Sequence, residues 1–73
     1  MTGVPVALQP HQQRVVDERN ALNIKWVALI AFSKMPLYAS LPEDERADLI
    51  EQAAAMKQYL DCLDRRIARW TPA

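Results

Sequence analysis

Residues 41–70, with the sequence LPEDERADLIEQAAAMKQYLDCLDRRIARW, decide the fold of this chain. Apolar side chains recur through this stretch at alternating steps of four and three residues: Leu49, Ala53, Met56, Leu60, Leu63, Ile67 and Trp70. This spacing places all of them on one stripe of an α-helix, and no other regular structure satisfies it. We therefore predict a long helix with one apolar face to bury.

Both ends of this helix carry recognisable signals. Ser40 is a candidate N-cap, and Glu43, three residues later, would complete a capping box. Pro42 is tolerated in the first turn, where backbone amides have no intrahelical partner. Acidic residues 43–45 lie at the positive end of the helix dipole, and the last turns carry Arg65, Arg66 and Arg69.

A second long helix is predicted before this one. Pro10 can open it, with Gln9 as the cap, and it should end near Ser33 or Lys34 because Pro36 disfavours helix in the residue before it. Its apolar stripe is predicted to consist of Val15, Leu22, Ala28, Leu29 and Phe32. The short connection, residues 34–41, makes the two helices antiparallel neighbours, with Leu37 and Tyr38 plugging the closed end. The predicted fold class is an all-α antiparallel helical hairpin.

The chain divides into three parts. We expect residues 1–9 to form an N-terminal arm, residues 10–70 the helical hairpin domain, and residues 71–73 a tail. The arm contains the chain's one glycine, Gly3, together with Pro5. It is either a frayed terminus or a strap over the apolar surface of a neighbouring subunit.

Self-association is expected because 73 residues bury only a thin core. Cys62 is the chain's one cysteine, so no disulfide can form within the chain, and a lone cysteine is typical of a reducing compartment. Residues 24–32 are apolar on all sides except at Lys25. A lone hairpin would leave several of them in water, and such patches usually mark an interface: Ile24, Val27, Ile30 and Ala31.

Composition argues against several classes of function. Nine basic and nine acidic side chains give zero net charge, which is unfavourable for binding DNA or RNA polymers. No apolar run approaches the roughly 20 residues of a membrane span, and no basic region precedes an apolar N-terminal run as in a signal peptide. A soluble, cytoplasmic protein is expected. With one histidine, one cysteine and no recognisable catalytic motif, neither an enzyme nor a metal or cofactor site is expected.

Binding is better supported than catalysis. Arg65, Arg66 and Arg69 cluster near one helix end, which either complements the dipole or forms an anion site. On the first helix, His11 and Arg14 precede Lys25, and His11 lies about 21 Å from Lys25 along the axis. If two copies of this helix cross antiparallel near Glu18, His11 of one copy meets Lys25 of the other. A ring and a cation brought together in this way suit a nucleotide, since the ring stacks on a base and the cation meets phosphate.

Several segments resemble a known family. They are residues 11–22 (HQQRVVDERNAL), 29–32 (LIAF), 40–45 (SLPEDE), 52–56 (QAAAM), 59–60 (YL) and 66–67 (RI). Together they resemble the small phage proteins that counter CBASS immunity by binding cyclic oligonucleotides as sponges. The helical hairpin of that family is shared with a sponge that acts against Thoeris signalling.

The resemblance implies a homohexamer built from dimers, which binds the cyclic nucleotide messenger of the bacterial host without a catalytic step. One class of pocket, between paired subunits, takes cyclic dinucleotides and matches His11 and Lys25 here. A second class, on three-fold axes, takes cyclic trinucleotides and matches Arg66, with Arg65 as the alternative.

This sequence departs from the family in one respect, because His11 stands where the family has tyrosine. Stacking is therefore expected to be weaker, and dinucleotide binding to be pH-dependent or absent, which leaves the ligand preference open. Two other functions are considered beside the sponge for cyclic nucleotides. One is a helical hairpin that docks onto another protein as an adaptor or inhibitor, and the other is a sponge for cyclic ADP-ribose signals.

Overall fold

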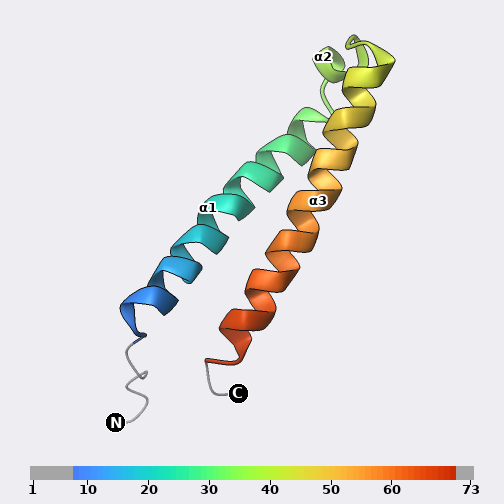
Figure 1. Cartoon of the computed structure of the whole chain (residues 1–73). Helices are drawn as coiled ribbons and strands as arrows, with labels where there is room; N and C mark the ends of the chain where they lie inside the picture. The colour runs from blue at the N-terminus through green and yellow to red at the C-terminus, as the bar shows by residue number, and fades with distance from the viewer. Residues whose placement is uncertain (1–7, 71–73) are drawn as a thin grey trace.

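The computed structural model describes residues 8–70, which form two long helices and one short one. Helix α1 spans Pro10–Phe32, α2 spans Pro36–Ala39 and α3 spans Glu43–Ala68. Helices α1 and α3 lie side by side and antiparallel, and α2 lies in the connection between them (Figure 1). The predicted all-α antiparallel hairpin is confirmed. We call the end with α2 the closed end and the opposite end the open end.

Helix α1 begins and ends close to the predicted positions. Pro10 occupies the first turn after Gln9, whose backbone N–H donates to the side-chain oxygen of Gln12 at 2.9 Å. The helix ends at Phe32, and the backbone N–H of Ser33 still donates to the carbonyl of Leu29 at 3.0 Å. Differences of one or two residues at a helix end are within the range of fraying.

The start of α3 differs from the prediction. The Ser40 hydroxyl donates to the carbonyl of Leu37 at 2.7 Å and so completes α2. Helix α3 begins at Glu43 with Pro42 as its N-cap residue, and the predicted capping box of Ser40 and Glu43 is therefore wrong. The predicted charges are in place, with acidic residues 43–45 in the first turn and Arg65 and Arg66 in the last. They complement the helix dipole at both ends.

The core follows the predicted stripe of α3. All seven stripe residues are buried or half-buried, and Leu60 and Leu63 are 3% and 1% exposed. Val15 packs in the same half of the hairpin, nearer the open end, and is 9% exposed. On α1 the predicted face is correct for most residues but wrong for Ala28, which is exposed, while Trp26 is half-buried. The fully buried core within residues 8–70 is thus confined to Val15, Leu60 and Leu63.

The closed end is held by Tyr38. Its ring lies 6.0 Å from that of Phe32 in an edge-to-face arrangement, and its hydroxyl donates to the carbonyl of Arg46 at 3.2 Å. This confirms the plug predicted for Tyr38. Leu37 is 62% exposed, so the same prediction is wrong for that residue.

Apolar residues remain on the surface of the single chain. Ile24 is 70% exposed and Val27 50% exposed, and Ala31 is exposed beside them, as the sequence predicted. Ile30 is half-buried instead, because it turns toward α3. One hairpin therefore leaves a substantial apolar strip of α1 in contact with water.

Candidate ligand-binding face

Four exposed polar residues of α1 share one side of the helix. His11, Arg14, Glu18 and Lys25 follow one another at steps of three, four and seven residues, which keeps them in one row. The row is long, because His11 and Lys25 lie about 21 Å apart along the helix axis. The three predicted site residues of α1 therefore face one way but cannot touch a single small molecule together within one chain.

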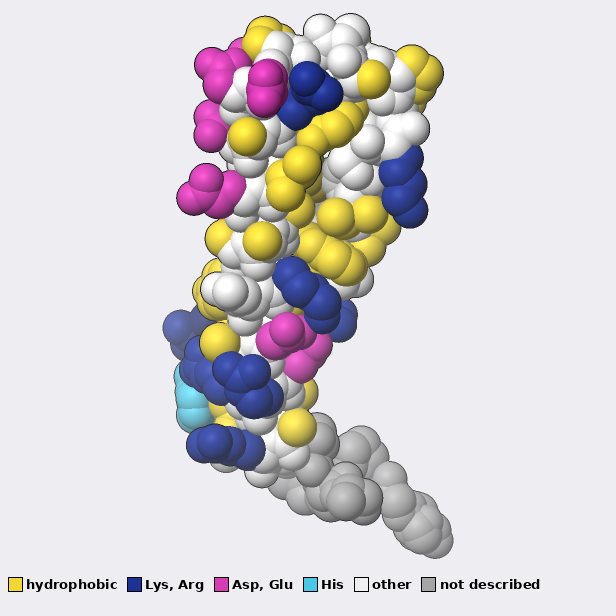
Figure 2. Space-filling view, turned by 90° about the vertical axis from the view of Figure 1, so that its right-hand side faces the viewer, with side chains coloured by type: hydrophobic (Ala, Val, Ile, Leu, Met, Phe, Trp, Pro, Cys, Tyr) yellow, Lys and Arg dark blue, Asp and Glu magenta, His cyan; other side chains and the backbone are white. Residues whose placement is uncertain are grey.

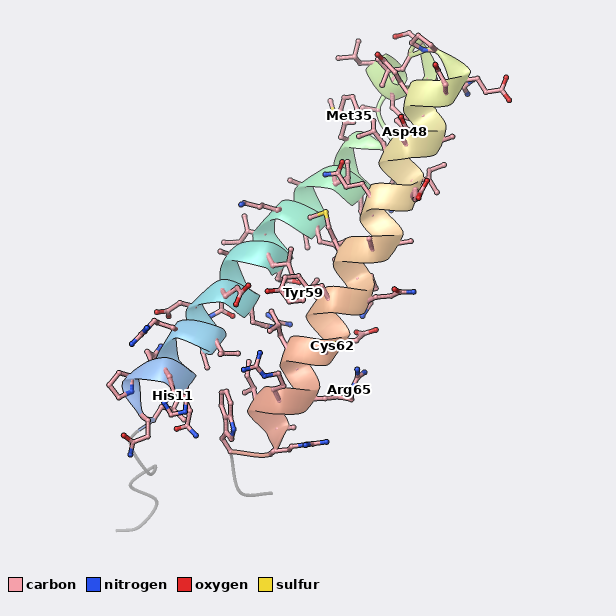
Figure 3. The ribbon with its side chains drawn as sticks, in the orientation of Figure 1. His11, Met35, Asp48, Tyr59, Cys62 and Arg65 are labelled. Carbon is pink, nitrogen blue, oxygen red and sulfur yellow. The ribbon has the colours of Figure 1, made fainter. Side chains whose placement is uncertain are left out.

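A contact between Glu18 and Tyr59 determines which side of α3 meets this row. The Tyr59 side chain points from α3 toward α1 (Figure 3). Its hydroxyl donates a hydrogen bond to the Glu18 carboxylate of α1. Arg66 follows Tyr59 by seven residues and so lies on the same side of α3. We define the Tyr59 face as the six residues of these two rows: His11, Arg14, Glu18, Lys25, Tyr59 and Arg66. The sequence analysis did not identify Tyr59 as a site residue.

The electrostatics of Tyr59 agree with this placement. The hydrogen bond to Glu18 raises the pKa of Tyr59 above its usual value of 10.0, and partial desolvation and the Glu18 charge act in the same direction. The Arg66 charge acts in the opposite direction and lowers the pKa of Tyr59. Arg66 is thus close enough to influence the phenol. Tyr59 is also 45% exposed, so part of its ring is open to water.

Arg65 and Arg66, the two arginines of α3 that the sequence predicted as ligand-binding residues, have different surroundings. The Arg66 guanidinium lies 6.0 Å from the centre of the Trp70 ring, a cation–π distance. Arg65 instead donates to the Cys62 sulfur at 3.0 Å and extends from α3 away from α1 (Figure 3). The structure therefore places Arg66 on the Tyr59 face and Arg65 outside it.

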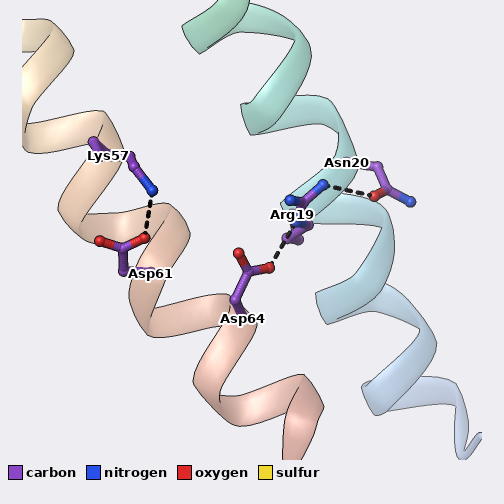
Figure 4. Close-up of polar contacts among 5 residues, drawn as sticks. All are labelled: Arg19, Asn20, Lys57, Asp61 and Asp64. Carbon is purple, nitrogen blue, oxygen red and sulfur yellow. Dashed lines mark hydrogen bonds and ion pairs between the residues drawn. The ribbon is translucent and has the colours of Figure 1, made fainter.

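Other charged residues form ion pairs elsewhere on the hairpin. Arg19 pairs with Asp64 across the two helices at 2.7 Å, and Lys57 pairs with Asp61 within α3 at 2.7 Å (Figure 4). The Lys57 ammonium also lies 5.7 Å from the centre of the Trp26 ring. These cations are already engaged with carboxylates, which makes them poorer partners for an anionic ligand.

An apolar pocket of about 300 Å³ opens beside Lys57 in the half of the hairpin nearer the closed end. Small side chains at Ala53 and Ala54 leave the space that a larger residue would fill. The Ser33 hydroxyl at its wall donates to the carbonyl of Ile30 at 2.6 Å, so this polar group is already satisfied. The pocket is lined by Trp26, Leu29, Ile30, Ser33, Tyr38, Leu49, Ile50, Ala53, Ala54 and Lys57.

Charge is unevenly distributed along the molecule. Figure 2 shows basic side chains and the histidine gathered near the open end, with acidic side chains concentrated toward the closed end. Apolar side chains lie between them over the upper half of this view. The open end, which includes His11, Arg14 and Arg66, is therefore the region that attracts anions most strongly.

The residues of the Tyr59 face carry groups that are suited to binding a ligand. Across residues 8–70, no group of three histidine, cysteine or acidic side chains gathers closely enough to hold a metal ion. In the same part of the chain, every helix is too short or too polar to cross a membrane. The Tyr59 face offers cations, an exposed phenol and a carboxylate, which together can hold a planar, anionic molecule.

Comparison with known proteins adds a family. A family model described as Sequestin matches residues 9–69, which covers the whole hairpin. The chain is also 33% identical over 60 residues to a protein of Enterobacteria phage T4, described as an uncharacterized 7.5 kDa protein in the denB-rIIB intergenic region. That match covers 82% of this chain and 94% of the phage protein. No solved structure matches the chain significantly.

Proposed function

Because this chain belongs to the Sequestin family, we propose that it binds and sequesters cyclic di- or trinucleotide messengers of a bacterial host and keeps them from their effector. The family's name denotes sequestration, a role that requires binding and no catalytic step. The resemblance of residues 11–22 and the later segments to the anti-CBASS sponges supplies the class of ligand. In an infected cell such a protein would act in the cytoplasm, where the messenger is made.

The observation that carries the proposal is the composition of the Tyr59 face. Lys25 and Arg66 supply charges for phosphate, and an exposed aromatic ring lies between them along the hairpin. Nucleotides are recognised by this combination, because cations form charge-assisted bonds with phosphate and aromatic rings stack on bases. A hairpin that only docked onto a protein would not need cations and an aromatic ring on one face.

A complete pocket requires more than one copy. The exposed strip of Ile24 and Val27 supports self-association, because hiding apolar surface is favourable. Where two copies cross antiparallel near Glu18, His11 of one approaches Lys25 of the other. The homohexamer implied by the family resemblance would contain such pairs. The neutral overall charge is no obstacle, because a pocket shared by symmetric copies contains each cation more than once.

Two classes of pocket are proposed. The positions where His11 and Lys25 meet, with Arg14 nearby, would take cyclic dinucleotides, and Arg66 would serve the cyclic trinucleotide pocket. Arg65 is the weaker alternative, because its guanidinium already donates to the Cys62 sulfur. No DNA or RNA polymer, metal or cofactor is part of this proposal.

Thermal unfolding with a panel of ligands tests the function. The panel contains cyclic di-AMP, cyclic GMP–AMP, cyclic tri-AMP and cyclic ADP-ribose. A ligand at about 100 times its Kd adds about 2.7 kcal/mol of stability, which is a large shift for a small domain. Mass spectrometry after heating should recover the ligand intact. A linear product would contradict sequestration, and a shift with cyclic ADP-ribose alone would favour the sponge for Thoeris signals.

The apolar pocket favours a second candidate function. It lies next to Ile50, which is 61% exposed, and could receive an apolar side chain of another protein. An adaptor or inhibitor of this kind would show no shift with any member of the panel.

A further inference from the structure

We propose that Tyr59 contacts the ligand directly, as the surface on which a base of the cyclic nucleotide stacks, and that Glu18 is the positioning residue that holds the Tyr59 ring. This inference rests on the proposed function and adds to it a residue of α3 that neither the sequence analysis nor the family resemblance assigned to the site.

The position of Tyr59 fits this role. The side chain is 45% exposed, although its hydroxyl is bound to Glu18 of the other helix. The hydrogen bond fixes one end of the ring and leaves ring surface open to water. A ring held in place before the ligand arrives loses little conformational freedom on binding, which favours affinity.

The charges around Tyr59 are arranged for a nucleotide. Lys25 lies seven residues after Glu18 on α1, in the direction of the closed end. Arg66 lies seven residues after Tyr59 on α3, in the direction of the open end. Each step of seven residues is about 10.5 Å, so the two cations lie on opposite sides of the Glu18–Tyr59 level and about 21 Å from each other. A ligand with a base on the Tyr59 ring can therefore reach only one of them, Lys25 or Arg66. Phosphates are attracted to either cation. At the central level the Glu18 carboxylate repels phosphate, so the phosphates of the ligand would lie to one side of the Tyr59 ring.

The α1 helices of two copies would cross at the level of Glu18 and Tyr59. In a pair that crosses near Glu18, the Tyr59 side chain of each copy lies beside the crossing point, between the two symmetric positions where His11 and Lys25 meet. Tyr59 would therefore supply a ring to pockets in which His11 stands in place of the family's tyrosine. This would compensate for the weaker stacking expected of an imidazole.

Isothermal titration calorimetry of the full chain with cyclic di-AMP, cyclic GMP–AMP and cyclic tri-AMP tests the assignment. Tyr59→Phe keeps the ring and should bind the preferred ligand within about threefold of the natural chain, whereas Tyr59→Leu loses the stacking surface and should bind about tenfold or more weakly. Tyr38→Phe is the matched control, because it removes the hydroxyl of the other tyrosine, at the closed end. Circular dichroism and sedimentation velocity accompany each variant.

Glu18 variants test the positioning role. Glu18→Ala frees the Tyr59 hydroxyl and should weaken binding several-fold, whereas Glu18→Gln retains an acceptor oxygen and should restore it. The absorbance of tyrosinate gives a second readout, because loss of the Glu18 contact should lower the pKa of Tyr59 toward its usual value.

The outcomes separate this inference from the function on which it rests. If the natural chain binds a cyclic nucleotide and Tyr59→Leu binds it equally well, the assignment is wrong while the sponge remains. The assignment also fails if Tyr59→Leu loses binding only because the assembly dissociates, since the ring is then part of a subunit interface. If the natural chain binds none of the probes, the proposed function and the assignment both fail.

Discussion

Arg19 and Asp64 join the two long helices through an ion pair, with Nε of the guanidinium 2.7 Å from a carboxylate oxygen. Their side chains are 30% and 49% exposed, so water and salt screen the pair. The pair lies on a different side of the hairpin from the hydrogen bond between Tyr59 and Glu18. The helices are thus connected by polar contacts on two sides, with the apolar core between them.

Asp64→Asn should lower the free energy of unfolding only slightly. Exposed ion pairs contribute about 0.2–1 kcal/mol, and added salt should reduce the difference between variant and natural chain. Urea unfolding followed by circular dichroism at low and high salt measures it. Asp61→Asn is the control, because its partner Lys57 lies on the same helix. A loss of several kcal/mol at Asp64 would contradict the interpretation of a screened surface pair.

Leu63→Ala should be strongly destabilising. Leu63 is 1% exposed, and truncating a buried leucine usually costs about 2–5 kcal/mol. Because the core contains few other buried side chains, this loss should unfold much of the population at room temperature. The helical signal in circular dichroism reports it. Leu37→Ala, at a site 62% exposed, should change stability little, and an equal effect of the two substitutions would contradict the placement of the core.

The titration of Tyr59 should be displaced to higher pH. Its pKa is raised by the hydrogen bond to Glu18, so the folded chain holds the phenolic proton more tightly than the unfolded chain, whose value is near 10.0. The resulting stabilisation is fully present below that pH and is lost as pH rises through the higher pKa of the folded state. Tyrosinate absorbance in a Tyr38→Phe background isolates Tyr59. Adding Glu18→Ala should bring the titration back toward the usual pH.

Ile24→Glu should reduce self-association. Ile24 is 70% exposed on α1, and a carboxylate there would have to be desolvated in any interface built on this strip. Sedimentation velocity at micromolar concentration should show the natural chain as an oligomer and the variant as a smaller species. Leu37→Glu is the control, since Leu37 is similarly exposed but lies in α2. A well-folded monomer of the natural chain would contradict the proposal of pockets between copies.

Lys25→Ala and Arg66→Ala should affect different ligands. If dinucleotides and trinucleotides occupy separate pockets, Lys25→Ala weakens cyclic GMP–AMP selectively and Arg66→Ala weakens cyclic tri-AMP selectively. Loss of a charge-assisted hydrogen bond of about 1.5–3 kcal/mol corresponds to a reduction in affinity of about tenfold or more. Calorimetry measures the affinity for both ligands. Lys57→Ala is the control, because Lys57 lies outside the Tyr59 face and pairs with Asp61. Equal loss of both ligands in either variant would indicate a single pocket.

The sequence predicted α3 well because its stripe is unambiguous. Alternating steps of four and three between Leu49 and Trp70 fit one helical face only, and the structure buries that face. Around Trp26 the first helix is apolar on all sides, so periodicity could not select the inward side. The wrong assignments there, Ala28 as inward and Ile30 as outward, follow from this lack of contrast.

The candidate site was only partly predictable for a different reason. Local spacing shows that His11 and Lys25 share a side of α1, but it says nothing about the helix that lies opposite. Glu18 and Tyr59 are 41 residues apart, and their contact depends on how the two helices are rotated against each other. Tyr59 directly precedes Leu60, which belongs to the apolar stripe of α3, so Tyr59 lies at the edge of the face that meets α1. This position could have identified Tyr59 once the inward side of α1 was known.

The small core has a consequence for how the amount of protein relates to binding capacity. If Ile24, Val27 and their neighbours are covered only when copies meet, the folded state is favoured by a high concentration of chains, and its stability cannot be stated apart from that concentration. The number of complete pockets would then rise more steeply than the number of chains synthesised. Below a threshold of expression there would be almost no capacity for the messenger, and above it the capacity would appear abruptly.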